Sequence, residues 1–197
     1  MIHQPQHYTD QELIQRYKDG DESCLRELLN RYQSKIFTAI CMRVKDEYLA
    51  EDIFQETFIK VIYTIKSGGY NEEGKFLPWV IRIARNLVID HFRRQQRKPV
   101  ITNTDGSDVL ELLSFAEEDA ESNLLKDQSY VDLKKLIKLL PDEQKEVLIM
   151  RHFCDMSFKE IAEITEVSIN TALGRMRYAL NNLRRMIEDH KLTFQFS

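Results

Sequence analysis

The sequence is poor in the residues from which disulfide frameworks, fibrous proteins and membrane spans are built. Its 197 residues include 3 cysteines, 6 glycines and 4 prolines. Cys24, Cys41 and Cys154 lie far apart and form no Cys-x-x-Cys pair, so neither a disulfide framework nor a zinc site is expected. No apolar run approaches the roughly 18 residues of a membrane-spanning helix. We therefore expect a globular protein with three buried free thiols.

An excess of positive charge is also absent. The chain carries 28 Lys and Arg against 32 Asp and Glu, a formal net charge of −4. Such a balance disfavours a protein that coats nucleic acid unaided. The N-terminal residues lack the basic and then apolar layout of a secretion signal, so we expect a cytoplasmic protein without membrane insertion.

The sequence is rich in apolar side chains at three- and four-residue spacing, which is typical of amphipathic helices. No segment shows the alternation of a strand, and no internal repeat occurs. The spacing predicts an all-α protein. The expected helices cover approximately residues 10–20, 22–40, 46–66, 78–97, 123–139, 142–153, 157–165 and 168–188.

Two segments carry a capping box, in which a Ser or Thr side chain and a Glu side chain three residues later each accept a hydrogen bond from the other's backbone N–H. Thr9 and Glu12 form one, and Ser157 and Glu160 form the other. Each box predicts a helix N-terminus. Gly20 lacks a Cβ and therefore suits the end of the first helix.

An acidic segment separates two groups of predicted helices. Residues 105–125 contain seven Asp or Glu and no Lys or Arg. As a coil, a segment of roughly 25 residues spans about 25–30 Å. We therefore predict two small helical domains, residues 1–98 and 124–197, joined by an acidic linker over residues 99–123.

The C-terminal domain has the pattern of a helix-turn-helix: a short helix after Ser157, a turn at Glu166-Val167, and a longer helix capped by Ser168. The second helix has an apolar face and an opposite face of arginines, amides and hydroxyls, which suit phosphates and base edges in the major groove. Gly174 on that face allows a close approach to the backbone. The alternative is an ordinary amphipathic helix with a solvated polar face.

The predicted helix from Pro78 to Arg97 also has a basic face. Six basic residues and one acid, Asp90, lie between Ile81 and Lys98. Trp79 falls at the edge of this face, and an aromatic ring beside arginines suits single-stranded nucleic acid, because it offers stacking for bases and charge for the backbone. The alternative for Trp79 is a ring packed in the core.

The predicted helix at 46–66 presents a third kind of surface. Opposite its apolar stripe lie Asp52, Gln55, Glu56, Ile59, Lys60 and Tyr63. An exposed isoleucine and tyrosine among acids and amides are more typical of a protein-docking patch than of a purely solvated face. The acidity of this surface argues against DNA binding there.

Three motifs in a fixed order give the chain its resemblance to a known family. The first two are Ala50-Glu51-Asp52-Ile53-Phe54-Gln55-Glu56-Thr57-Phe58 and Phe76-Leu77-Pro78-Trp79-Val80-Ile81-Arg82-Ile83-Ala84-Arg85-Asn86. The third is Leu140-Pro141 followed by Ser157-Phe158-Lys159-Glu160-Ile161-Ala162. With these motifs, nearly the whole chain resembles bacterial RNA polymerase sigma factors of the extracytoplasmic-function type, which are group 4 of the sigma-70 family. The resemblance implies sigma domain 2 at residues 1–98 and sigma domain 4 at residues 124–197.

The resemblance also implies a role for each surface. In the family, domain 2 docks on the clamp helices of core RNA polymerase and holds the opened −10 promoter element, and domain 4 reads the −35 element as duplex. The core-docking residues are then Asp52, Gln55, Glu56 and Ile59. The −10 residues are Tyr70, Asn71, Trp79, Arg82, Arg85, Asn86, Arg93 and Arg97. The −35 residues are Ser168, Asn170, Thr171, Gly174, Arg175, Arg177 and Tyr178.

On this reading the chain is not an enzyme, because the polymerase supplies the catalytic metal site. No cofactor or metal is expected. The implied partners are core RNA polymerase, promoter DNA and, as is common in the family, an anti-sigma factor. The recognition helix has Thr171-Ala172-Leu173-Gly174-Arg175 where many relatives have Thr-Val-Lys-Ser-Arg, so the −35 base sequence is not carried over.

Three other functions fit parts of the sequence. A two-domain transcriptional regulator would bind duplex DNA directly through the helix-turn-helix, but it leaves the 46–66 surface unexplained. A protein-binding adaptor would need no DNA-binding face. A helical metalloenzyme would use the carboxylates and histidine of the first domain, but the repeated Glu-x-x-His pattern of such bundles is absent. Its candidate ligands are Glu51, Asp52, Glu56, Asp90 and His91.

Overall fold

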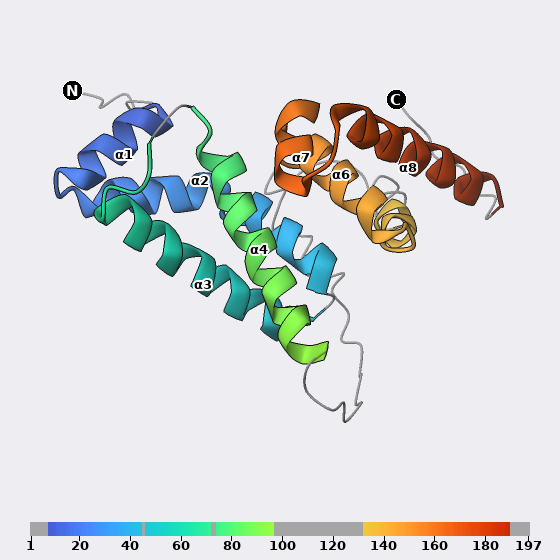
Figure 1. Cartoon of the computed structure of the whole chain (residues 1–197), viewed down its shortest axis with the longest axis horizontal. Coiled ribbons are helices and arrows are strands. Elements are labelled where there is room, and N and C mark those ends of the chain that lie inside the picture. Colours follow the sequence, from blue (N-terminus) through green and yellow to red (C-terminus); the bar gives the residue numbers. More distant parts are fainter. Residues whose placement is uncertain (1–7, 45, 72–73, 97–131, 190–197) are drawn as a thin grey trace, which may run out of the picture.

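The computed structural model describes residues 8–44, 46–71, 74–96 and 132–189. Within these ranges all regular secondary structure is helical (Figure 1), as the apolar spacing predicts. The first group of helices is α1 (Asp10–Lys18), α2 (Glu22–Val44), α3 (Glu47–Lys66) and α4 (Phe76–Gln96). The second group is a helical stretch at 132–138 followed by α6 (Asp142–His152), α7 (Phe158–Thr165) and α8 (Ile169–Asp189). The predicted acidic linker at 99–123 lies outside the described residues.

The predicted capping boxes are both present. The Thr9 backbone N–H donates to Glu12 Oε2 at 2.7 Å, and the Glu12 N–H donates to Thr9 Oγ1 at 3.3 Å. At α7 the corresponding bonds between Ser157 and Glu160 measure 2.8 and 3.3 Å. These bonds satisfy N–H groups that a helix N-terminus otherwise leaves without partners. Gly20 adopts φ 107°, the backbone region expected for it after α1.

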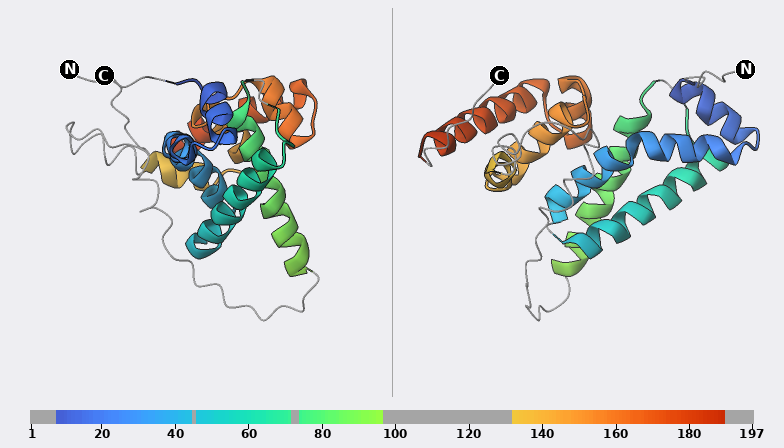
Figure 2. Two further views of the ribbon diagram at one scale, coloured as in Figure 1. Left: turned by 90° about the vertical axis from the view of Figure 1, so that its left-hand side faces the viewer. Right: turned by 180° about the vertical axis from the view of Figure 1, so that it is seen from behind.

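The first unit is a bundle with α2 at its centre. α2 contacts α1, α3 and α4, and α3 runs alongside α4 (Figures 1 and 2). Burying one Leu or Ile side chain contributes about 1.5–3 kcal/mol relative to exposure, so the interior of this bundle is its main source of stability. Its most completely buried side chains include Leu13, Ile14, Leu28, Ile36, Ile40, Val61, Ile65, Phe76, Val80 and Ile81.

α4 begins two residues earlier than predicted. Phe76 is its first residue, and Pro78 lies in the first turn, where a missing N–H costs no intrahelical hydrogen bond. The first turn is closed when the Trp79 N–H donates to the carbonyl oxygen of Lys75 at 3.0 Å. The early start places Phe76 in the core, 1% exposed, and fixes the rotation of the helix that carries the predicted basic face.

The second unit contains the predicted helix-turn-helix. α6 and α7 both pack against α8. Glu166 ends α7 in the left-handed conformation, φ 57° and ψ 42°, and the Val167 N–H donates back to the carbonyl oxygen of Ala162 at 3.0 Å. This tight turn directs the chain from α7 into α8 within three residues.

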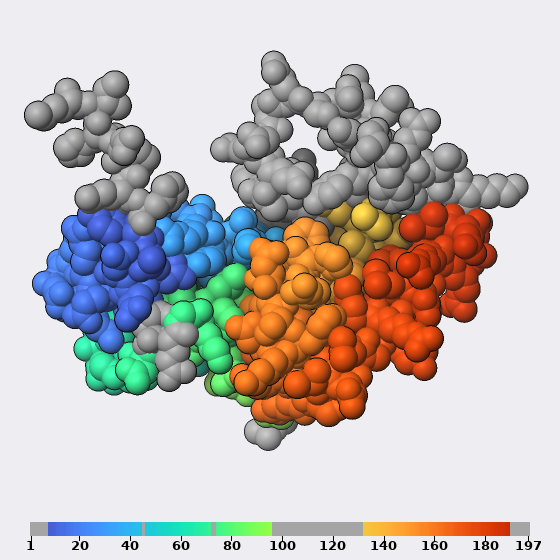
Figure 3. All heavy atoms as spheres, turned by 90° about the horizontal axis from the view of Figure 1, so that it is seen from above, coloured from blue at the N-terminus to red at the C-terminus, as the bar shows by residue number. Residues whose placement is uncertain are grey.

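The two units touch each other. α6 packs against α2, and α7 packs against α4. Figure 3 shows the atoms of the second unit, in orange, packed directly on the blue and green atoms of the first. These contacts join helices that are more than 60 residues apart in the chain, and they were not predicted from the sequence.

Candidate protein-binding and nucleic-acid surfaces

The predicted docking face of α3 lies on the surface. Asp52, Gln55, Glu56 and Ile59 are all exposed, and Ile59 is 65% exposed. The opposite side of the helix is buried as predicted, and the Thr57 hydroxyl donates to the carbonyl oxygen of Ile53, which satisfies the one polar group of the stripe. The resulting surface combines carboxylates with a large apolar side chain, which suits a protein partner.

Tyr63, which the helical pattern places on the same face, extends this surface. It is 75% exposed and lies one turn after Ile59 on the same face of α3. Together with Trp79 and Ile83 of α4, these two residues line a shallow groove between the helices. The groove joins the predicted docking face to the predicted −10 face. The spacing Ile59 to Tyr63 was the signal in the sequence.

Trp79 packs within an aromatic cluster and remains partly exposed. Its ring centroid lies 4.0 Å from that of Tyr70 and 6.0 Å from that of Phe76. Tyr70 is only 5% exposed. The ring thus packs against neighbouring aromatic rings while Trp79 stays partly exposed, and its contact with nucleic acid remains a prediction. Tyr70 supports Trp79 in this conformation, and its burial favours packing over the direct DNA contact predicted for it.

The residues predicted to bind the −10 element differ in exposure. Arg82, Asn86 and Arg93 are exposed, as is Asn71 in the preceding loop. Arg85 is different: its side chain is 15% exposed and forms an ion pair with Glu146 of α6. Predicted residue Arg97 lies outside the described residues.

The N-terminal half of α8 presents the predicted −35 residues to solvent. Ser168, Asn170, Thr171, Arg177 and Tyr178 are exposed, and Tyr178 is 65% exposed. Ser168 caps the helix as predicted, because its Oγ accepts a hydrogen bond from the Thr171 N–H at 3.1 Å. Hydroxyls, an amide and an arginine thus surround the first turns of a helix that sits beyond a tight turn, as DNA recognition requires.

Two predicted residues of α8, Gly174 and Arg175, are only partly exposed. A Cβ added at Gly174 would meet no atom of the described residues within 4 Å. Packing inside the chain therefore does not require glycine here. Glycine costs roughly 1 kcal/mol of helix propensity relative to alanine, and packing among the described residues does not explain its presence here.

The apolar stripe predicted for α8 is only partly covered. Ala172, Met176, Ala179 and Leu183 are buried. Ile169, Leu173 and Leu180 stay 47%, 44% and 37% exposed. These three side chains leave part of the apolar face uncovered, because α6 and α7 cover only one side of α8.

The three cysteines are buried and free, as predicted. Burial raises the pKa of the Cys41 and Cys154 thiols to about 12, so the reactive thiolate is scarce at neutral pH. In the described ranges no three His, Cys, Asp or Glu side chains are grouped so as to hold a metal ion. No described helix is long and apolar enough to cross a membrane.

Comparison with known proteins identifies both units. Residues 28–98 match the sequence profile of sigma-70 region 2, and residues 130–183 match that of sigma-70 region 4. The ECF RNA polymerase sigma factor SigW of Bacillus subtilis is 28% identical over 189 residues, which cover 89% of this chain and 95% of SigW. The chain belongs to the extracytoplasmic-function sigma factors.

A further relative agrees with this assignment, and two solved structures share the fold. The RNA polymerase sigma-H factor of Pseudomonas aeruginosa is 28% identical over 175 residues, which cover 85% of this sigma factor and 88% of the relative. The fold matches that of RpoE of Bartonella quintana, solved with the anti-sigma factor NepR, at a TM-score of 0.62 and 18% identity over 83% of this chain and 96% of that one. It also matches CnrH, solved with the cytosolic domain of CnrY, at a TM-score of 0.62 and 20% identity over 91% and 97%. The two matched regions fall within the predicted domains, whose bounds remain a prediction.

Proposed function

We propose that this chain binds core RNA polymerase and directs it to promoters. In this proposal α3 docks on the polymerase, α4 holds the opened −10 element, and α8 reads the −35 element as duplex DNA. The observation that carries the proposal is the adjacency of two unlike surfaces on the first unit. The groove lined by Ile59, Tyr63, Trp79 and Ile83 lies between α3, which carries the exposed acids, and α4, which carries the exposed arginines, while α8 exposes a separate hydrophilic face.

The energetics of −10 opening fit these surfaces. Separating duplex DNA costs about 1.4 kcal/mol per base-pair step. Stacking one captured base on an aromatic ring returns about 1–3 kcal/mol, and arginine contacts to phosphates add to this. The exposed part of the Trp79 ring supplies stacking, and exposed Arg82 and Arg93 supply positive charge. Capture of even one or two bases offsets a comparable number of separated steps.

No catalytic step is assigned to this chain. Its surfaces bind and position, and bond formation belongs to the polymerase. We place its action in the cytoplasm, where the polymerase works. An anti-sigma factor is a further expected partner, because the two solved sigma factors of similar fold carry a bound anti-sigma factor or the cytosolic domain of a partner protein.

Run-off transcription tests the proposal. Core polymerase and genomic promoter fragments are incubated with and without the chain, and specific transcripts are expected only with it. A chain that changes neither the transcripts nor the retention of core polymerase in a pull-down would contradict the proposal. A regulator that binds duplex DNA directly would instead bind promoter fragments as well without core as with it.

A further inference from the structure

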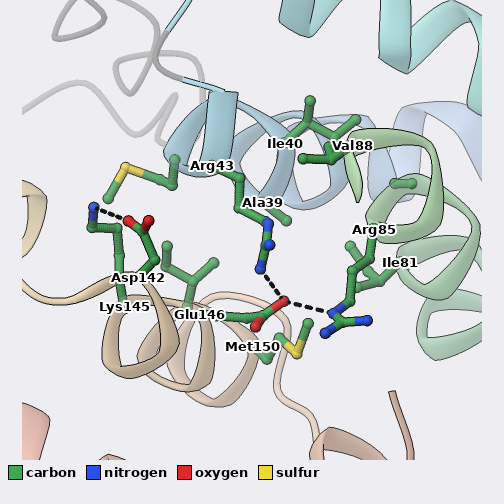
Figure 4. A pocket seen from close by; sticks show the side chains of 13 residues that line it. Ala39, Ile40, Arg43, Ile81, Arg85, Val88, Asp142, Lys145, Glu146 and Met150 are labelled. Carbon is green, nitrogen blue, oxygen red and sulfur yellow. Dashed lines mark hydrogen bonds and ion pairs between the residues drawn. The ribbon is translucent and has the colours of Figure 1, made fainter. Parts of the chain in front are cut away.

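Glu146 of α6 connects the two units. Its Oε1 accepts a hydrogen bond from Arg85 Nε of α4 at 2.9 Å and lies 2.5 Å from Arg43 Nη1 of α2 (Figure 4). Glu146 therefore lies between two helices of the other unit, and both guanidinium groups point to the same oxygen. Its side chain is 5% exposed, which makes it one of the few buried acids of the described residues.

This carboxylate depends on the contact between units. A buried charge is costly unless it is paired and hydrogen-bonded, and Arg43 and Arg85, which pair with Glu146, both belong to the first unit. The rest of the contact is apolar, with Ile40, Ile81, Val88 and Met150 around the charged groups. When the units separate, water can solvate Glu146 and both arginines. A contact of this composition resembles a reversible interface more than a permanent core.

Two weaker ion pairs also join the units. Lys35 Nζ of α2 lies 2.6 Å from Asp155 Oδ2, and Arg82 Nη2 of α4 lies 3.9 Å from Glu163 Oε2 of α7. All four side chains are at least a third exposed, so solvent and salt screen these pairs. Glu146 is thus the most strongly buried acid in the contact.

The closed arrangement covers part of the proposed −10 surface. Arg85 is one of the residues proposed to bind the −10 element, and in the closed arrangement it forms an ion pair with Glu146. α7 packs on the same helix, α4. While the carboxylate accepts this hydrogen bond, the Nε–H of Arg85 is not available to a phosphate.

The closed arrangement also places α4 and α8, which are proposed to bind the −10 and −35 elements, too near each other to bind both at once. α8 packs on α7, and α7 on α4. With packed helices about 8–10 Å apart, the axes of α4 and α8 lie about 20 Å apart where they are linked through α7. The −10 and −35 elements are separated by about 25 base pairs, or about 85 Å of straight duplex at 3.4 Å per base pair. Both elements are therefore bound only after the units separate.

We infer that Glu146 is a latch: its pairs with Arg43 and Arg85 hold the free chain closed and keep α4 from DNA until the units separate. The inference rests on the proposed function, since it regulates the −10 surface assigned there. The latch surface is the side of α6 that carries Glu146, and its partner is the arginine pair of the same chain.

Two variants of the full chain test the latch. Glu146→Gln keeps the shape of the side chain and removes its charge, and Arg43→Gln weakens the latch without touching a residue proposed to bind DNA or polymerase. Glu143→Gln is the matched control, because it makes the same chemical change at an exposed position of α6. Arg43→Gln leaves Arg85 as a partner for Glu146, so it provides the test if Glu146→Gln does not fold. Far-ultraviolet circular dichroism checks folding in each case.

Two measurements report opening without relying on DNA or polymerase. Small-angle X-ray scattering gives the radius of gyration, which is expected to rise in both variants. Alkylation of Cys154 is followed by peptide mass spectrometry. Cys154 Sγ lies 3.9 Å from the Lys35 carbonyl oxygen of the other unit, so opening is expected to speed its alkylation. Wild-type values of both quantities in Glu146→Gln and Arg43→Gln would overturn the latch.

A third measurement links the latch to DNA. A short fluorescein-labelled single strand of mixed sequence is titrated with each free chain. Release of the latch is expected to tighten binding about five- to tenfold, a typical coupling between two states. Opening without tighter binding would overturn the claim that the latch keeps α4 from DNA. If, in addition, the wild-type chain gives no run-off transcripts, the proposed function fails while the structural latch stands.

Discussion

Tyr70 and Trp79 stack with their ring centroids 4.0 Å apart and their planes inclined by 31°. Tyr70 lies in the loop after α3, and Trp79 lies in the first turns of α4. The buried ring fixes the partly exposed one, so a base that meets Trp79 meets a surface already in position. Pre-positioning of this kind reduces the entropy that binding would otherwise lose.

Replacing Trp79 by alanine is expected to impair promoter opening more than initial promoter binding. The change removes about 1–3 kcal/mol of stacking per captured base and leaves the arginines in place. Permanganate reactivity of unpaired thymines measures opening, and filter binding measures the initial complex. Trp79→Phe is the control, since it keeps an aromatic ring against Tyr70. Equal loss of opening and binding in Trp79→Ala would mean that the ring has only a packing role.

Charge reversal on α3 is expected to weaken the polymerase complex without unfolding the chain. Asp52 and Glu56 are exposed, so Asp52→Lys and Glu56→Lys disturb no core packing. We expect each to reduce affinity for core polymerase about tenfold, which corresponds to about 1.4 kcal/mol. Glu188→Lys makes the same change on exposed α8 and serves as the control. Fluorescence titration with core polymerase measures the affinities, and equal values for all three variants would refute the docking assignment.

The left-handed conformation of Glu166 leads to a prediction about the free energy of unfolding of the second unit. This conformation is unfavourable by about 1–2 kcal/mol for a residue with a Cβ, but not for glycine. Glycine loses more freedom on folding, so Glu166→Gly is expected to stabilise the second unit by a net amount of about 0.5–1 kcal/mol. Urea unfolding followed by circular dichroism measures the change. Glu166→Ala keeps the strained backbone, and a gain as large as that of glycine would show that strain is not the cause.

At Gly174, a single substitution is expected to raise the stability of α8 and to weaken DNA binding. Since an added Cβ meets open space, Gly174→Ala is expected to stabilise α8 by about 0.5–1 kcal/mol. If DNA approaches the backbone there, the same methyl group is expected to weaken −35 binding. Footprinting of the assembled holoenzyme measures this binding, and thermal unfolding measures stability. Unchanged −35 protection in a stabilised variant would remove Gly174 from the DNA-binding surface.

Asp155 provides a titration test of the contact between units. The hydrogen bond and charge of Lys35 lower the pKa of Asp155 below its ordinary 3.8. Because the folded pKa is lowered, the pair contributes its stability above pH 3.8 and loses it as the pH falls through the folded pKa. Carbon-detected NMR measures the carboxyl directly. Lys35→Met is expected to return the pKa toward 3.8, and an unchanged value would mean that the two side chains do not meet in solution.

The sequence was sufficient for features that are set locally. The pairs Thr9 with Glu12 and Ser157 with Glu160 are three residues apart, so their capping boxes follow from spacing alone. The exposed position of Asp52 follows equally from the 3.6-residue period of α3. The roles of these surfaces came from the family resemblance, since helical spacing predicts exposure but does not name a partner.

What the sequence did not predict depends on contacts between distant segments. Glu146 is 103 residues from Arg43 and 61 from Arg85, and no periodic pattern connects them. The same limit applies to Leu173 and Leu180, whose exposure depends on where α6 and α7 end against α8. Trp79 lay at the edge of a helical face, and its environment was decided by Tyr70 in the preceding loop.

The carboxylate of α6 and its two arginines belong to one polypeptide. Closure is therefore a unimolecular equilibrium, and tethered contacts of this kind act at effective concentrations on the order of millimolar. Doubling synthesis of the chain doubles the open and the closed molecules alike. The number of open, promoter-competent molecules is therefore proportional to the amount of chain that is synthesised, and no threshold concentration exists.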